Sequence, residues 1–231
     1  MSNEQNILSG IKTTCNFGSV DENTKVYDMK EEVGKKILDY RLVKIKCQLK
    51  SNESIKGIQF IYRNINTSKE STLINVKPKK TDLDLVDQEM EFKMEDIIDL
   101  RIWLSSEYKL IGFEVMTSKD RTYKFGYGND DQLIKCADFD KKDNTIVGFG
   151  VGADDKNGVT SIFGYYLKKK SYAFYLYSGV ISLRIKIKDE EFRKKTESKL
   201  LPAMNEQNKI LYRVCSLPDN QFCNIIKYAF S

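Results

Sequence analysis

Apolar and polar residues alternate along much of this chain, and the alternation predicts β-strands. Apolar side chains recur at every second position towards the end of residues 37–49, and residues 54–62 repeat the pattern with Ile58, Phe60 and Tyr62. A period of two is typical of a half-buried strand. The apolar segments 100–104 and 110–115 are separated by a gap of hairpin length. Short strands with turns about every 8–12 residues predict an all-β sandwich or barrel-like domain.

The strongest local signal lies in residues 146–167, where two apolar segments flank a polar turn. The first segment is IVGFGVG and the second is VTSIFGYYL. Between them stand Asp154, Asp155, Asn157 and Gly158, and an Asn-Gly pair is a strong hairpin signal. Glycines inside strands mark bulges or close approach of another chain segment. The sequence therefore predicts a β-hairpin with a polar tip.

Four segments resemble blocks of jacalin-like lectin domains, and they follow the order of that family. Residues 146–167 are similar to its closing hairpin, and residues 110–126 are similar to its block IxSLxFxTNxxxTYGPFG. Residues 54–62 resemble the block IDSIQFxY, and residues 95–103 stand where the family has ExIxxVxG. The resemblance covers residues 34–167 and implies a jacalin-like β-prism over that range.

In that family the loop of the closing hairpin holds a sugar and has the pattern GxxxD. The resemblance places the glycine of this pattern at Asn157 and its aspartate at Ser161, and a serine has no charge with which to accept a charge-assisted pair of hydrogen bonds. It thus implies a degenerate carbohydrate loop, made of Asp154, Asp155, Asn157, Gly158, Val159, Thr160 and Ser161. Asp154 and Asp155 could accept sugar hydroxyls or a cation, but turn formation is the simpler interpretation.

Positive charge gathers in the last part of the chain. Residues 168–231 hold 13 lysines and arginines against six acids, a net +7, whereas residues 1–167 carry −2 of the total +5. Two runs of like charge, Lys168-Lys169-Lys170 and Arg193-Lys194-Lys195, form a predicted basic patch for an acidic surface of a partner protein. A solvated basic surface is the alternative. Nucleic acid is not expected, because packing explains the nearby aromatic residues more simply than base stacking does.

The pattern divides the chain into three parts. Residues 1–33 are polar and are expected to form an irregular N-terminal arm with at most one short strand, ahead of the prism at 34–167. Residues 168–231 are expected to form a basic β/α extension that packs on the prism or on a partner. Within it, residues 181–187 alternate like a strand. Residues 189–201 begin with acids and continue with lysines, which predicts a helix.

The composition excludes several kinds of chemistry. No histidine occurs among the 231 residues, so a Ser-His-Asp or Cys-His site is impossible within this chain, and the commonest metal ligand is missing. We therefore expect no enzymatic activity, no cofactor and no metal. Five scattered cysteines without a CxxC pair indicate reduced thiols in a cytosolic protein. The N-terminal residues lack a signal-peptide pattern, and no apolar stretch is long enough to span a bilayer.

These features predict a non-enzymatic lectin-like domain reused as a structural or protein-interaction module in a larger intracellular assembly. The Lys-, Asn- and Ile-rich composition is typical of an AT-rich protist genome, which favours a cytoskeletal or ciliary setting. The alternative is a cytosolic carbohydrate-binding lectin, and an array of glycans discriminates between the two.

Overall fold

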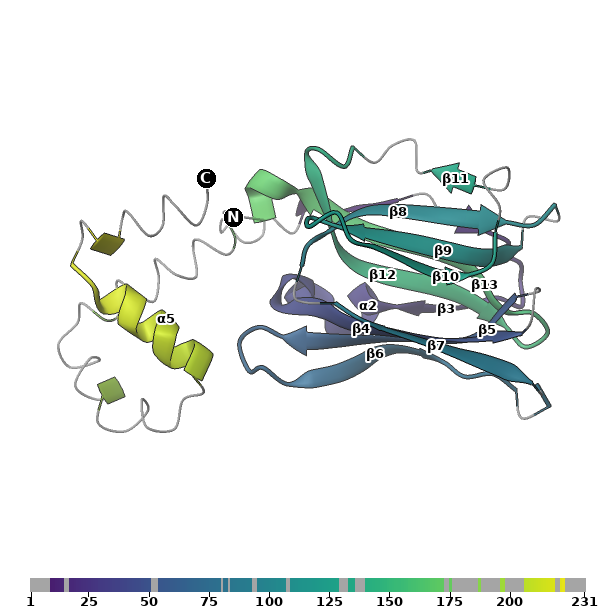
Figure 1. Cartoon of the computed structure of the whole chain (residues 1–231), viewed down its shortest axis with the longest axis horizontal. Coiled ribbons are helices and arrows are strands. Elements are labelled where there is room, and N and C mark those ends of the chain that lie inside the picture. The colour runs from purple at the N-terminus through teal and green to yellow at the C-terminus, as the bar shows by residue number, and fades with distance from the viewer. Residues whose placement is uncertain are drawn as a thin grey trace. The chain divides into compact units, whose positions relative to one another are not determined.

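The chain divides into two compact units, residues 1–169 and residues 170–231. The computed structural model describes residues 9–14, 17–50, 54–79, 81–82, 84–92, 95–106, 109–128, 133–135, 140–172, 175, 187, 196–197, 206–218 and 221–222. Every described strand belongs to the first unit, and the second contains helix α5 (Glu206–Ser216). Figure 1 shows both units along the chain.

The first unit is built from two antiparallel sheets (Figure 1). The smaller sheet has the order β6 (Glu70–Val76), β5 (Ser54–Asn64), β4 (Tyr40–Lys50) and β7 (Leu85–Glu91). The larger sheet has the order β1 (Lys12–Thr13), β13 (Gly158–Lys168), β12 (Asn144–Asp154), β8 (Ile97–Leu104), β9 (Leu110–Thr117) and β10 (Thr122–Gly126). Three short strands join it from the side: β2 (Phe17–Gly18) on β13, β3 (Lys25–Asp28) on β12, and β11 (Leu133–Lys135) on β8.

These strands enclose one core from three sides. Within the larger sheet, β12 and β8 meet at a seam with one registered pair, Ile146 with Ile97. Phe60 of β5, Phe113 of β9 and Phe149 of β12 meet in the core, with ring centroids 5.1 Å apart for Phe60 and Phe149 and 6.4 Å apart for Phe60 and Phe113. The first unit is therefore a jacalin-like β-prism, and the predicted all-β fold class is confirmed.

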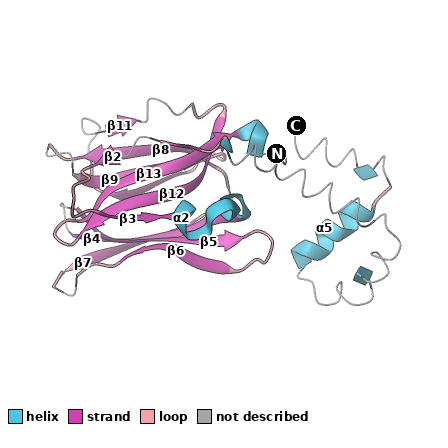
Figure 2. Ribbon diagram, turned by 180° about the vertical axis from the view of Figure 1, so that it is seen from behind, coloured by secondary structure: helices cyan, strands magenta, loops and turns pink. Residues whose placement is uncertain are grey.

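The N-terminal residues take part in this prism. Strands β1, β2 and β3 all pair with β12 or β13, and helix α2 (Met29–Val33) and the 3-10 helix η1 (Gly34–Asp39) follow them (Figure 2). Asp28 caps α2 by accepting a hydrogen bond from the Lys30 amide at 2.7 Å. The polar composition of this segment concealed the strands, because each is at most four residues long and takes its hydrogen bonds from a longer neighbour.

The predicted closing hairpin is confirmed. Strand β12 pairs with β13 from Asn144 and Lys168 at the open end to Asp154 and Gly158 at the turn, with register shifts in two places. Glycine is required where another group lies against the strand. A β-carbon at Gly150 would fall 2.1 Å from the ring of Phe163.

The second unit has a small apolar cluster of its own. Ile187, Tyr212, Cys215 and Phe222 are buried against one another, with Val214 and Leu217 packed beside them. The apolar segment at 210–215 lies in α5. The predicted strand at 181–187 and helix at 189–201 fall almost entirely outside the described residues. No helix among the described residues is long and apolar enough to cross a membrane.

Candidate functional site

The turn between β12 and β13 is held together by one carboxylate. Asp154 accepts hydrogen bonds from the Lys156 amide at 2.7 Å, from the Asn157 amide, and from the Asn157 side-chain Nδ2 at 2.8 Å. Burial disfavours the charged form, but the bonds from Asn157 and Lys156 and the nearby Lys56 ammonium outweigh it and lower the pKa of Asp154 below its ordinary value. Asp154 is therefore an ionised turn former.

The structure separates the seven residues of the predicted carbohydrate loop into two groups. Asp154, Asp155, Asn157 and Gly158 lie at or beside the turn, with Asp155 exposed. Val159, Thr160 and Ser161 lie in strand β13 rather than in a loop, and all three are buried. The reason is that the ladder runs on to the pairs Ala153–Val159 and Asp154–Gly158. Ser161, at the family's aspartate position, is 0% exposed and faces no solvent.

A groove lies on one side of this turn. Its volume is about 340 Å³, and we call it the polar groove. It is lined by the start of β5, the β8–β9 connection and the start of β13, through Ser54, Lys56, Ser105, Ser106, Lys109, Leu110, Ile111, Asn157, Val159 and Thr160. Most of these side chains carry hydroxyl, amide or ammonium groups, so the groove can donate and accept hydrogen bonds.

A smaller hollow of about 100 Å³ also borders the turn, and we call it the lysine hollow. Its charged lining consists of Lys25, Lys56, Lys77, Lys79, Lys156, Asp82, Asp154 and Asp155. Sequence analysis missed it, because these residues come from four separate segments.

Lys56 connects the two sites, since it lines both. Its Nζ donates a hydrogen bond to the Asn157 carbonyl at 3.2 Å. Gly158 makes this approach possible: its φ is +82°, and a β-carbon there would fall 2.6 Å from the Ile55 carbonyl oxygen. The turn thus lies directly against the backbone of β5.

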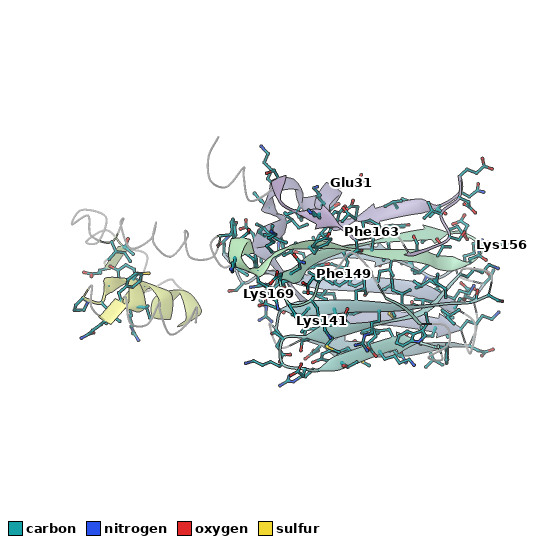
Figure 3. All side chains as sticks on the ribbon, turned by 90° about the horizontal axis from the view of Figure 1, so that it is seen from above. Glu31, Lys141, Phe149, Lys156, Phe163 and Lys169 are labelled. Carbon is teal, nitrogen blue, oxygen red and sulfur yellow. The ribbon has the colours of Figure 1, made fainter. Side chains whose placement is uncertain are left out.

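The predicted basic patch is described only in part. Lys168, the last residue of β13, is exposed, whereas the Lys169 ammonium donates to the Lys141 carbonyl at 3.0 Å. Lys170 is exposed and begins the second unit. Figure 3 shows Lys141 and Lys169 at the end of the hairpin opposite to Lys156. Arg193, Lys194 and Lys195 lie outside the described residues, so the patch stays a prediction.

The described part of the chain contains no group of three cysteine, aspartate or glutamate residues placed to hold a metal ion. Asp154 and Asp155 do not make an acid–base pair either. One carboxylate is committed to its own turn, and the other stands exposed at the tip.

Comparison with known proteins gives likenesses of structure alone. No family model and no curated protein matches the sequence. A variant of Malaysian banana lectin is similar at 14% identity and a TM-score of 0.46, over 69% of this chain and 99% of that one. Calystegia sepium agglutinin is similar at 15% identity and a TM-score of 0.48, over 68% of this chain and 97% of that one.

A mannose-binding jacalin-related lectin from Ananas comosus is also similar, at 16% identity and a TM-score of 0.41, over 69% of this chain and 99% of that one. The similar structures thus include the family that the sequence blocks resemble. At this level of identity they leave the function open.

Proposed function

We propose that this chain is a non-enzymatic, lectin-like β-prism that works as a structural or protein-interaction module in a larger intracellular assembly, cytoskeletal or ciliary. The observation that supports this most directly is the hydrogen bonding of Asp154 in the β12–β13 turn. The Asp154 carboxylate already accepts three hydrogen bonds from Lys156 and Asn157. Little acceptor capacity remains for a pair of sugar hydroxyls, and the buried Ser161 cannot supply it.

The proposed partner is an acidic protein surface, bound through Lys168, Lys169, Lys170, Arg193, Lys194 and Lys195. The charge of +7 over residues 168–231 supports this choice, because a field of one sign attracts a partner of the opposite sign. The same field is screened by salt, since the Debye length falls from about 10 Å at 0.1 M to about 3 Å at 1 M.

The test uses the tagged full chain in its cell of origin. We expect salt of about 1 M to release the chain from its assembly, and the double variant Lys168→Glu/Lys170→Glu to be released already at physiological salt. The variant spares Lys169, whose ammonium holds the Lys141 carbonyl. Lys35→Glu/Lys36→Glu is the matched control, since these two exposed lysines make the same change of charge on η1. Retention of both wild type and test variant at 1 M salt would show that apolar burial holds the chain.

A carbohydrate-binding lectin is the second candidate, and the polar groove is the observation that favours it. Its volume of about 340 Å³ and its hydroxyl, amide and ammonium lining suit a polyol. A glycan array with the full chain tests this candidate. Binding of a neutral glycan that is weakened by Ser54→Ala/Ser106→Ala would make the groove a sugar site and overturn the protein-interaction proposal.

A further inference from the structure

Ion pairing differs among the basic residues of the first unit. Several of them form ion pairs: Arg41 with Asp96 at 2.8 Å, Lys44 with Glu89 at 2.7 Å, Arg101 with Glu114 at 3.1 Å and Arg121 with Glu95 at 3.0 Å. Within the part of the chain that the structure describes, the five lysines of the lysine hollow form none. Five lysines without an ion pair therefore line a single hollow.

The fold brings these five lysines together from distant positions. Lys25 lies in β3, Lys56 in β5 and Lys156 in the β12–β13 turn, while Lys77 and Lys79 follow the end of β6. Lys56 is fixed by its bond to Asn157. The other four are exposed. The Lys25 ammonium lies over the Tyr27 ring, 5.0 Å from its centre, which leaves Lys77, Lys79 and Lys156 as the most accessible cations.

The aspartates of the hollow do not balance this charge. Three carboxylates face five ammoniums. Asp154 is hydrogen-bonded within its own turn, and Asp82 accepts a hydrogen bond from the Lys79 backbone amide at 2.9 Å. A concave site lined by an excess of one charge concentrates ligands of the opposite charge.

We propose that the lysine hollow binds the side-chain carboxylates of an acidic segment in a partner protein. This site lies in the prism and is separate from the predicted basic patch, but it rests on the proposed function in that its partner is a protein. Lysine ammoniums act as point charges on flexible side chains, so they can bind an oxyanion in several orientations.

The polar groove favours a peptide as the carrier of this anion. The groove and the hollow are adjacent, because Lys56 lines both. A peptide chain offers an N–H and a C=O at nearly every residue, and the Ser54, Ser106 and Asn157 side chains in the groove can bond to both kinds of group. One extended segment would thus place an acidic side chain in the hollow and backbone in the groove.

The experiment titrates the full chain into a fluorescein-labelled peptide of eight glutamates and follows its anisotropy at about 0.1 M salt. We expect Lys77→Glu/Lys79→Glu to weaken binding by about tenfold, because two exposed attractions become repulsions. The control Lys35→Glu/Lys36→Glu should bind like the wild type. Lys35 and Lys36 precede the first residue of β4, whereas the lysine hollow lies near the last. The eleven residues of β4 span about 33 Å, so the control charges are far from the hollow.

A second variant guards against misfolding. Lys25→Gln/Lys79→Gln removes both charges but keeps a polar side chain at each position, and it should weaken binding by a few-fold, with an unchanged circular dichroism spectrum. Equal losses in the test and control variants would reduce the effect to net charge and overturn the proposal.

Three further outcomes separate this proposal from the proposed function. If Lys168→Glu/Lys170→Glu abolishes peptide binding while Lys77→Glu/Lys79→Glu does not, the lysine hollow is excluded and the basic patch remains. If the peptide does not bind at all although the chain leaves its assembly at high salt, the hollow is again excluded. If a sulfated oligosaccharide of equal charge binds the hollow tenfold more tightly than the peptide, the assignment to a protein segment is wrong.

Discussion

Replacing Asp154 by alanine removes the acceptor that closes the β12–β13 turn. The two backbone amides and the Asn157 side chain that it holds would lose their partner. A hydrogen bond to a charged group contributes roughly 1.5–3 kcal/mol. We expect the whole substitution to cost about 2 kcal/mol, and not three times one bond, because the site is half-buried and water replaces part of what is lost.

Urea unfolding measures this loss. Trp103 is the only tryptophan in the chain and is 4% exposed in β8, so its fluorescence reports the unfolding of the prism. With a dependence on urea of about 2 kcal/mol per molar, the midpoint should fall by about 1 M with an unchanged slope.

The neighbouring aspartate supplies the control. Asp155 is exposed and forms no hydrogen bond or ion pair within the described part of the chain, so Asp155→Ala should change stability by less than about 0.5 kcal/mol. Equal midpoints for the two variants would refute the view that Asp154 is a turn former, and its carboxylate would then be available to a ligand.

Three further predictions concern the same unit. Phe149→Ala should destabilise the prism by about 3–5 kcal/mol, because a fully buried ring stacked on Phe60 is lost, while Val86→Ala at a half-exposed edge should be nearly neutral in the same urea assay. Cys47 should resist alkylation in the native protein and react on unfolding, as peptide mass spectrometry can follow, because burial raises the pKa of its thiol well above the ordinary range. The lowered pKa of Asp154 stabilises the fold above about pH 4, and this contribution is lost as pH falls through the folded-state pKa, so acid unfolding should be shallower in Asp154→Ala than in the wild type.

The parts of the fold that depend on short-range pattern could be predicted from the sequence. Two apolar segments around an Asn-Gly turn predict the hairpin at 146–167, and two apolar segments with a short gap predict β8 and β9. The short strands β1 to β3 could not be found this way. They exist because β12 and β13 offer them unpaired edges, and their own residues carry no alternation.

The candidate sites depend on strand register and on contacts between distant segments, and the sequence predicts neither reliably. The resemblance matches Ser161 to the family's aspartate, but only the register of the β12–β13 ladder shows that Ser161 is buried within β13. The lysine hollow was invisible because Lys25 and Lys156 are 131 positions apart in the sequence. The spacing of residues along the chain does not predict this cluster, because only the folded prism brings these lysines together.

The seam at Ile146 and Ile97 makes the resistance of the prism to local opening differ from place to place. On either side of it, strands are joined by long ladders, whereas the described residues at the seam give one registered pair, supported by the Thr145 hydroxyl bond to the Ile97 carbonyl at 3.1 Å. Backbone hydrogen bonding therefore resists opening within each face far more than between these two faces. The aromatic cluster of Phe60, Phe113 and Phe149 acts across that division, so side-chain packing fixes the angle between the faces. Local opening should start along this line, and the amides beside it should exchange with solvent before those in the middle of the hairpin.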